Sequence, residues 1–262
     1  MGDSEAGQVS EAAAKIYEEV YLPALFQQWC PLVVQAANVV AGDSVIDVAC
    51  GTGALAIAVS DHIAPNGTVV GVDINQAMLN IAKSKSSFVT WLNAPAEALP
   101  FNENSFNRAV SQFGLMYFEN QETAIREMMR VLQPGAILVV VVWDELANNP
   151  GLFAEEHLWQ QVFGEAVDET PYHLGDKGVL ENLFKKSGVS DFQIKTHQGI
   201  ARFDSIENWI HTGARGWTND DALNDDELGI LLDTAEKELT DFRTRQGAVA
   251  FPISTHIVTA RK

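Results

Sequence analysis

A glycine-rich turn that directly follows a short apolar segment is the feature that most constrains how this chain of 262 residues folds. Residues 44–48 read SVIDV, a β-branched run typical of a buried strand. Residues 49–53 continue as ACGTG, and residues 54–62 follow a helical pattern. Without side chains, Gly51 and Gly53 let the backbone approach a ligand closely. This order predicts the ligand-binding edge of a parallel sheet.

The alternation of strand and helix continues to residue 143. Further strands are expected at residues 67–72, 87–92, 107–112 and 137–143. Between them, Asn75 and Asn120 begin helices that extend to about Lys85 and through Leu132. The strand at 137–143 is apolar on both faces, which is typical of a parallel sheet covered by helices. With right-handed crossovers, these units predict a doubly wound α/β fold.

The segments outside this core follow other patterns. Residues 1–10 are expected to form a loose tail, and residues 11–40 to form helices that Pro23 and Pro31 divide. Residues 144–173 hold a Pro150-Gly151 turn and several aromatic side chains. Helices are then expected at 176–186 and within 205–245, and strands at 189–203 and 251–260.

Charge and cysteine content exclude several classes of protein. Seventeen basic against 35 acidic residues give a net charge of −18, which repels nucleic acids and anionic lipid surfaces. Cys30 and Cys50 are too few for a disulfide framework, and the six histidines show no metal-ligand spacing. The acidic N-terminus is unlike a signal peptide, and no apolar run could span a membrane. A cytoplasmic protein without a metal is therefore expected; a monomer and a homodimer both remain open.

Asp73 strengthens the prediction of a nucleotide site. It ends the second expected strand, 22 residues after Gly51. A carboxylate at that place can accept hydrogen bonds from both ribose hydroxyls of an adenosine, and it would repel a 2′-phosphate.

Residues 45–53, 71–79, 96–107 and 112–135 together resemble successive motifs of the class I S-adenosylmethionine-dependent methyltransferases. The nearest subgroup is that of the ubiquinone/menaquinone-biosynthesis-like small-molecule enzymes, and the resemblance covers about residues 44–143. It implies a Rossmann-like, mostly parallel, seven-stranded sheet with a helical insertion that forms a lid. It also implies in-line transfer of a methyl group from S-adenosyl-L-methionine to a small molecule, with S-adenosyl-L-homocysteine as product.

On this resemblance, four regions are expected. Residues 1–43 would form helices covering the cofactor site, and residues 44–143 the Rossmann-like core. Residues 144–250 would hold the remaining sheet elements with a helical insertion on the acceptor side, and residues 251–262 the closing strand.

The resemblance also implies contacts to the cofactor. The methionine part would face the first turn, and Asp73 would hold the ribose. The adenine would lie against the next helix and a later loop, and the sulfonium would lie at the end of the fourth strand. The residues concerned are Asp47, Ala49, Gly51, Thr52, Gly53, Asp73, Ile74, Met78, Ala96, Glu97, Gln112 and Phe113. The chain departs from the family at Pro95, where an aspartate is frequent, so that side-chain contact to the adenine amine is lost.

No fixed catalytic triad is expected, because the sulfonium already activates the methyl group and a base is needed only if the acceptor must lose a proton. The candidate bases are His157, His173, His211 and Tyr117. A further group of aromatic residues predicts a largely apolar pocket or lid for the acceptor: Trp143, Trp159, Tyr172, Trp209 and Trp217. Residues 155–157 (EEH) and the acidic run 220–227 are interpreted as solvated helix faces.

Three alternatives remain open. Residues 51–56 also match a loose dinucleotide pattern, so an NAD-dependent oxidoreductase is one; against it, Asp47 would repel a pyrophosphate. A non-catalytic module that keeps the S-adenosylmethionine pocket is the second. The third is a methyltransferase acting on nucleic acid or protein; for nucleic acid, the charge and the absence of an Asn/Asp-Pro-Pro-Tyr/Phe segment at 112–115 argue against it.

Overall fold

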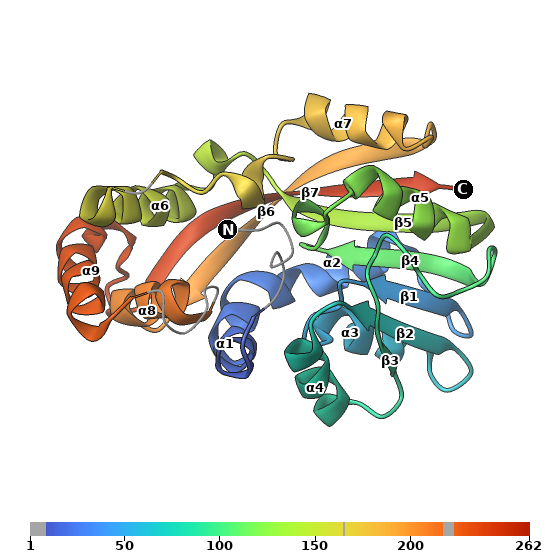
Figure 1. The fold of residues 1–262 in the computed structure, drawn as a ribbon, viewed down its shortest axis with the longest axis horizontal. Coiled ribbons are helices and arrows are strands. Elements are labelled where there is room, and N and C mark those ends of the chain that lie inside the picture. Colours follow the sequence, from blue (N-terminus) through green and yellow to red (C-terminus); the bar gives the residue numbers. More distant parts are fainter. Residues whose placement is uncertain (1–8, 165, 217–222) are drawn as a thin grey trace.

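A computed structural model describes residues 9–164, 166–216 and 223–262 and shows a seven-stranded sheet packed against helices (Figure 1). The strand order is β3-β2-β1-β4-β5-β7-β6. Strands β1 to β5 are parallel to one another, and β7 is antiparallel to both β5 and β6. The bounds are β1 Ser44–Val48, β2 Thr68–Asp73, β3 Thr90–Asn93, β4 Phe106–Gln112, β5 Leu132–Trp143, β6 Phe192–Phe203 and β7 Val249–Arg261. The predicted fold class is confirmed.

The helices alternate with these strands as expected over residues 44–143. Their bounds are α1 Glu11–Ile16, α2 Cys30–Ala36, α3 Ala54–Ile63, α4 Gln76–Lys85, α5 Gln121–Val131, α6 Pro150–Phe163, α7 Lys177–Lys186, α8 Ile206–Gly216 and α9 Asp225–Glu238. The predicted caps are present, since the Asn75 and Asn120 side chains accept the backbone N–H groups of Met78 and Thr123.

The strand order reverses between β1 and β4. From β1 the chain moves outward through β2 to β3, and then returns to β4 on the other side of β1. Crossovers of this kind are right-handed, so the helices following β1 and β2 lie on the opposite face from the helix following β4. Ligands bind beyond the carboxyl ends of the strands at such a reversal. In this chain those ends lead into residues 49–53 after β1 and residues 112–114 at the end of β4.

Two predictions about prolines were wrong. Pro23 does not divide the N-terminal helices but lies inside a continuous π-helical segment, η1 Tyr17–Phe26. The wider turns of a π-helix change the i−4 contact that makes proline incompatible with an α-helix. Pro150 does not form an irregular turn but begins α6, where a missing N–H costs nothing. Pro31, by contrast, lies in the first turn of α2 and so marks the start of a new helix, as expected.

Some predicted bounds also shift. The third strand covers 90–93 rather than 87–92, and β5 begins at Leu132, directly where α5 ends, rather than at Ile137. Trp217 and the first residues of the acidic run, 220–222, lie outside the described residues; Asp225 and Asp226 are exposed in the first turn of α9.

The β6–β7 hairpin extends past the rest of the sheet. These two strands pair from Phe192 to Phe203, whereas β5 pairs with β7 only up to Thr255. In Figure 1, α6, α8 and α9 surround the extended part of the hairpin. An aromatic cluster fills the space between them and the hairpin, formed by Phe203, Trp209, Phe242 and Phe251. The helical insertion is therefore anchored on the two last strands.

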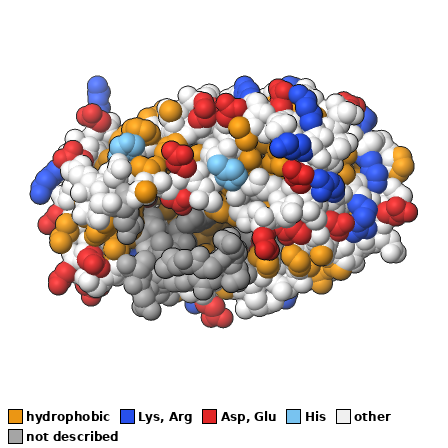
Figure 2. Space-filling model, turned by 45° about the horizontal axis from the view of Figure 1, so that its top comes forward, with side chains coloured by type: hydrophobic (Ala, Val, Ile, Leu, Met, Phe, Trp, Pro, Cys, Tyr) orange, Lys and Arg blue, Asp and Glu red, His pale blue; other side chains and the backbone are white. Residues whose placement is uncertain are grey.

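Charged side chains are unevenly distributed on the face shown in Figure 2, where most Lys and Arg side chains lie toward the right-hand end. That end carries α5 and α7, whose last turns contain Arg130, Lys185 and Lys186. The end formed by α6 and α9 has fewer basic side chains on this face.

Candidate cofactor and acceptor sites

The two glycines of the turn after β1 have different physical roles. Gly51 has a φ of 53°, and a Cβ built on it would meet no atom within 4 Å, so its surroundings leave room for close approach of a ligand. Gly53 has a φ of 86°, but a Cβ there would lie 2.3 Å from the Trp91 ring. Gly53 is therefore required by packing, and Gly51 by an open approach to the backbone.

Asp73 joins this turn to the end of β2. Its carboxylate accepts hydrogen bonds from the backbone N–H of Gly51 at 2.7 Å and from that of Asn75 at 2.8 Å. Burial raises the pKa of the carboxyl group, and the two backbone N–H donors oppose that rise. Since a carboxylate has about four acceptor positions, Asp73 keeps capacity for further donors.

Three polar side chains meet at a small cavity of about 30 Å³ beside this turn: the buried Asp47 and Thr52, and the half-buried Gln112. Among the described residues, neither carboxylate oxygen of Asp47 has a hydrogen-bond partner of good geometry, and the same holds for Thr52 Oγ1 and Gln112 Oε1. Burial raises the pKa of Asp47 well above its usual value, although the Ala56 backbone N–H opposes the rise. Because buried polar atoms are nearly always paired, this group suits a ligand that brings hydrogen-bond donors.

The N-terminal helical segment lies over the same cavity. Tyr17 and Leu22 of η1 line it, together with Ala49, Gly51 and other residues of the turn. The Gln112 side chain donates a hydrogen bond to the carbonyl oxygen of Phe26 at 3.2 Å. The Asn75 side chain donates one to the carbonyl oxygen of Val9 at 3.1 Å. The segment is thus tied to the ends of β2 and β4.

The residues predicted near adenine lie outside the lining of this cavity. Ile74 is 49% exposed, which is unusual for isoleucine, whereas Met78 and Ala96 are buried. The Glu97 carboxylate accepts a hydrogen bond from the Asn120 backbone N–H at 3.2 Å. The structure therefore brings together the predicted methionine-side residues and Asp73, whereas the predicted adenine-side residues do not line this cavity.

Backbone strain is concentrated where β1 and β4 end. Ala49 and Phe113 have φ values of 59° and 57°, a conformation that side-chain-bearing residues rarely adopt. A Cβ on Gly114 would lie 2.5 Å from the Ala49 Cβ, so the two strand ends are in contact. The strained residues flank the predicted site, as is common for residues that shape binding sites.

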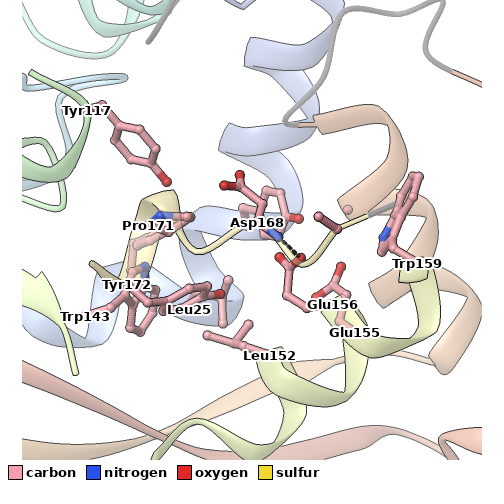
Figure 3. Close-up of a pocket in the computed structure, with 14 residues that line it drawn as sticks. Leu25, Tyr117, Trp143, Leu152, Glu155, Glu156, Trp159, Asp168, Pro171 and Tyr172 are labelled. Atoms are coloured by element: carbon pink, nitrogen blue, oxygen red, sulfur yellow. Dashed lines mark hydrogen bonds between the residues drawn. The ribbon is translucent and has the colours of Figure 1, made fainter. Parts of the chain in front are cut away.

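A second, larger cavity of about 290 Å³ lies between η1, the end of β5, α6 and the loop before α7 (Figure 3). Its lining is mostly aromatic and acidic: Tyr21, Leu25, Phe26, Tyr117, Trp143, Leu152, Glu155, Glu156, Trp159, Ala166, Asp168, Pro171, Tyr172 and Gly213. Of the aromatic residues predicted for an acceptor pocket, Trp143, Trp159 and Tyr172 line it. Trp209 is fully buried behind it.

Aromatic rings separate the two cavities. The Phe113 ring centroid lies 4.4 Å from that of Trp143 and 5.1 Å from that of Phe26. Tyr17, which lines the small cavity, stacks on Phe26 at 5.4 Å. Phe26 and Trp143 line the large cavity. The predicted sulfonium-side residue Phe113 therefore adjoins the wall of the larger cavity.

Glu155 corrects the interpretation of residues 155–157 as a solvated face. Its side chain is buried, 8% exposed, and its Oε2 accepts a hydrogen bond from the Trp209 indole N–H at 2.7 Å. Burial raises the pKa of the carboxyl group to about 8. The sequence carries no signal for this pairing, because Trp209 is 54 positions away on another helix. Glu156 is half-buried and accepts the Asp168 backbone N–H at 3.2 Å, whereas His157 is exposed.

Only one of the candidate bases lines the larger cavity. Tyr117 does so, while His157 stacks on Phe153, His173 pairs with Gln121, and His211 is exposed on α8. No group of His, Cys, Asp or Glu suited to a metal ion occurs in the described ranges. Within the same ranges, no helix is both long and apolar enough to cross a membrane, and Cys30 and Cys50 are unpaired.

Known proteins have sequences and folds similar to those of this chain. A demethylmenaquinone methyltransferase of Staphylococcus epidermidis is 28% identical over 191 residues, which cover 65% of this chain and 78% of that protein. The YcgJ protein of Bacillus subtilis has a similar structure, with a TM-score of 0.62, 20% identity, and coverage of 90% of this chain and 98% of that one.

A phosphoethanolamine N-methyltransferase of Haemonchus contortus, solved with phosphomonomethylethanolamine and S-adenosylhomocysteine, also shares the fold. It has a TM-score of 0.62, 16% identity, and coverage of 97% of this chain and 57% of that one. The model of the ubiE/COQ5 methyltransferase family matches residues 15–199, more than half of the chain. This protein therefore belongs to the ubiE/COQ5 methyltransferase family.

Proposed function

We propose that this methyltransferase binds S-adenosylmethionine beyond the carboxyl ends of β1, β2 and β4, and that it methylates a small molecule held in the larger cavity. The observation that carries the proposal is the buried Asp47 carboxylate, which has no well-formed partner among the described residues and lies beside the open approach at Gly51. An α-ammonium group supplies the donors and the positive charge that such a carboxylate needs.

The residues divide by the part of the cofactor they would hold. Asp47, Thr52 and Gln112 would bind the methionine part, with the backbone of Ala49 and Gly51 beside it. Asp73, already fixed by two backbone N–H groups, would accept the ribose hydroxyls. The exposed side chain of Ile74 would cover one face of the adenine, with Met78, Ala96 and Glu97 along the same surface.

S-adenosylmethionine supplies a methyl group activated by its sulfonium. The protein's own part is to align the acceptor with that group and to exclude water from the path. The contact of Phe113 with Trp143 and Phe26 gives this path apolar walls. In this proposal residues 1–43 cover the cofactor, residues 44–143 bind it, and the helices within 144–250 form the acceptor side and its lid.

The acceptor is proposed to be small and to have an apolar ring, because aromatic side chains dominate the larger cavity. The name of the Staphylococcus epidermidis relative makes a quinone precursor one candidate. We propose the cytoplasm as the location, because the two cysteines are buried thiols rather than a disulfide.

The test is calorimetric titration with S-adenosylmethionine and S-adenosylhomocysteine on wild type, Ile74→Ala and Asp73→Asn. We expect wild type to bind in the micromolar range. Ile74→Ala removes an exposed side chain, so it should leave folding unchanged but weaken binding by about fivefold, as expected for lost apolar burial. Asp73→Asn should weaken binding more strongly, because it loses the charge and one acceptor.

Ile230→Ala is the matched control, since Ile230 is 56% exposed on α9, away from the site. Equal binding by Ile74→Ala and Ile230→Ala would remove Ile74 from the adenine contact. Wild type that binds neither compound would contradict the proposed cofactor site, and NADH would then be titrated as the alternative.

A further inference from the structure

The larger cavity has an unusual charge balance for a site that takes a neutral or anionic ring. Three carboxylates line it, Glu155, Glu156 and Asp168, and the described lining residues include neither Lys nor Arg. Asp168, on the loop after α6, lies beside Glu156 and donates its backbone N–H to the Glu156 carboxylate (Figure 3). Burial raises the pKa of both glutamates, and a neighbouring acid adds to the rise, Glu156 for Glu155 and Asp168 for Glu156. The cavity is therefore strongly acidic.

Glu155 is the carboxylate that points to a ligand. It is more than nine-tenths buried, and only Oε2 is used, by the Trp209 indole. Its other oxygen accepts no hydrogen bond from the described residues. It lies against Gly213, where an added Cβ would be 2.1 Å from Oε1. Any residue larger than glycine at 213 would displace the carboxylate, so Gly213 leaves the room that Oε1 occupies beside α8.

Aromatic rings complete the surroundings of these carboxylates. Trp143, Trp159, Tyr21, Tyr117 and Tyr172 line the same cavity. The ring faces of tryptophan and tyrosine attract cations. Burial disfavours the charged form of Glu155, and a ligand cation beside it would stabilise that form. Both features favour the same chemical class of ligand.

We propose that the acceptor of this enzyme carries an ammonium group, which Glu155 binds inside the aromatic cavity with Glu156 and Asp168 nearby. This deepens the proposed function and rests on it, since it identifies the class of molecule that the acceptor cavity takes. Acidic residues on the acceptor side also offset the repulsion between an acceptor cation and the sulfonium. A neutral quinol, in contrast, has no charge to match the three carboxylates.

The test compares two one-ring probes of nearly equal shape, 2-phenylethylamine and 2-phenylethanol, by calorimetric titration of the full chain with and without S-adenosylhomocysteine. We expect the amine to bind at least about tenfold more tightly than the alcohol at pH 8.5, where Glu155 is ionised and the amine still carries its proton. Glu155→Gln should reduce amine affinity by about tenfold and leave alcohol affinity unchanged. The Gln side chain keeps an acceptor for the Trp209 N–H, so the fold should be maintained.

Glu207→Gln is the control, because it makes the same change of charge at an exposed position on α8. Equal affinities for amine and alcohol, or equal effects of Glu155→Gln and Glu207→Gln on amine affinity, would overturn the proposal. Binding of S-adenosylhomocysteine in the same titrations reports the cofactor site separately. Retained cofactor binding with a preference for the alcohol would reject the ammonium acceptor while leaving methyl transfer in place.

Discussion

Glu155 makes the stability of the chain depend on pH through a single side chain. Its pKa is about 8 in the folded chain, against an ordinary value of 4.5. Below pH 4.5 the group is protonated in both states and has no effect. Between pH 4.5 and 8 the unfolded chain releases the proton while the folded chain keeps it, so the free energy of unfolding falls as pH rises. Above about pH 8 the loss levels off.

We predict that Glu155→Gln removes this loss. Each pKa unit corresponds to about 1.4 kcal/mol, so the free energy of unfolding of the variant should fall less than that of wild type between pH 5.5 and 8.5, by up to about 3 kcal/mol. Urea denaturation of both proteins at the two pH values measures this. Asp47 and Asp73 also have raised pKa values, but they are present in both proteins. The difference in free energy of unfolding between variant and wild type therefore reports the contribution of Glu155 alone. Parallel stability curves would show that Glu155 is already ionised in the folded chain at pH 5.5.

Single residues were predictable where the chemistry is local. The places of Asp73 and Gly51 follow from their spacing and from the turn between them, because the carboxyl ends of neighbouring parallel strands meet. The role of Gly53 was not predictable, since it depends on the Trp91 ring packing over it. Glu155 was misinterpreted because burial of a helix face depends on which distant helix packs against it. No periodicity within residues 155–157 contains that information.

Among the elements, the edge strand β6 shows how the N-terminal segment is held. The Gln28 side chain accepts the backbone N–H of Ile200 at 3.0 Å and donates to the Ile200 carbonyl oxygen at 3.2 Å. Gly199 allows this approach, since a Cβ there would lie 2.5 Å from Gln28 Oε1. The amide thus behaves like one residue of a neighbouring strand and covers part of an exposed edge.

We predict that Gln28→Ala lowers the free energy of unfolding by about 1–2 kcal/mol, because two hydrogen bonds between distant segments are lost. Gln27→Ala is the control, since Gln27 is the exposed neighbour. Urea denaturation of the two variants and wild type gives the values. If the free energy of unfolding falls by the same small amount in both variants, the contact of Gln28 with β6 contributes nothing to stability.

Elements with clear start signals were predicted well, and those without were not. Asparagine caps and apolar periodicity located α4 and α5 to within about a residue. The Pro150-Gly151 pair has two interpretations, a turn or the start of a helix, and only the packing of α6 on the β6–β7 hairpin decides between them. The π-helical course of η1 has no signal in the sequence, because it depends on how Tyr17 and Phe26 pack over the strand ends.

For the whole molecule, the small size of the first cavity sets a condition on cofactor binding. A cavity of about 30 Å³ has room for a few water molecules at most, far less than S-adenosylmethionine requires. If the cofactor binds at Asp47, the covering residues Tyr17 and Leu22 must move. Within this segment, hydrogen bonds to the side chains of Gln112, Asn75 and Gln28 and the ion pair of Glu18 with Lys85 are the polar contacts that such a movement would change.

We predict that saturating S-adenosylmethionine changes amide hydrogen exchange in residues 17–26 more than in α7, which lies away from the cavity. Exchange followed by mass spectrometry measures both segments in one experiment. Unchanged exchange in residues 17–26, with binding confirmed by calorimetry, would mean that the cofactor enters without moving this segment.

The division of the chain between its two cavities has a consequence for how the enzyme family can diversify. All proposed cofactor contacts precede Gly114, whereas every acidic residue that lines the larger cavity follows β5, on α6 and the loop after it. Mutations can therefore change the acidic lining of the larger cavity without changing the proposed cofactor contacts. A gene duplicate that replaced the segment between β5 and β7 would acquire a new acceptor cavity while the proposed donor-binding residues stayed unchanged. A chimaera joined at Trp143 and Val249 would test this in the laboratory.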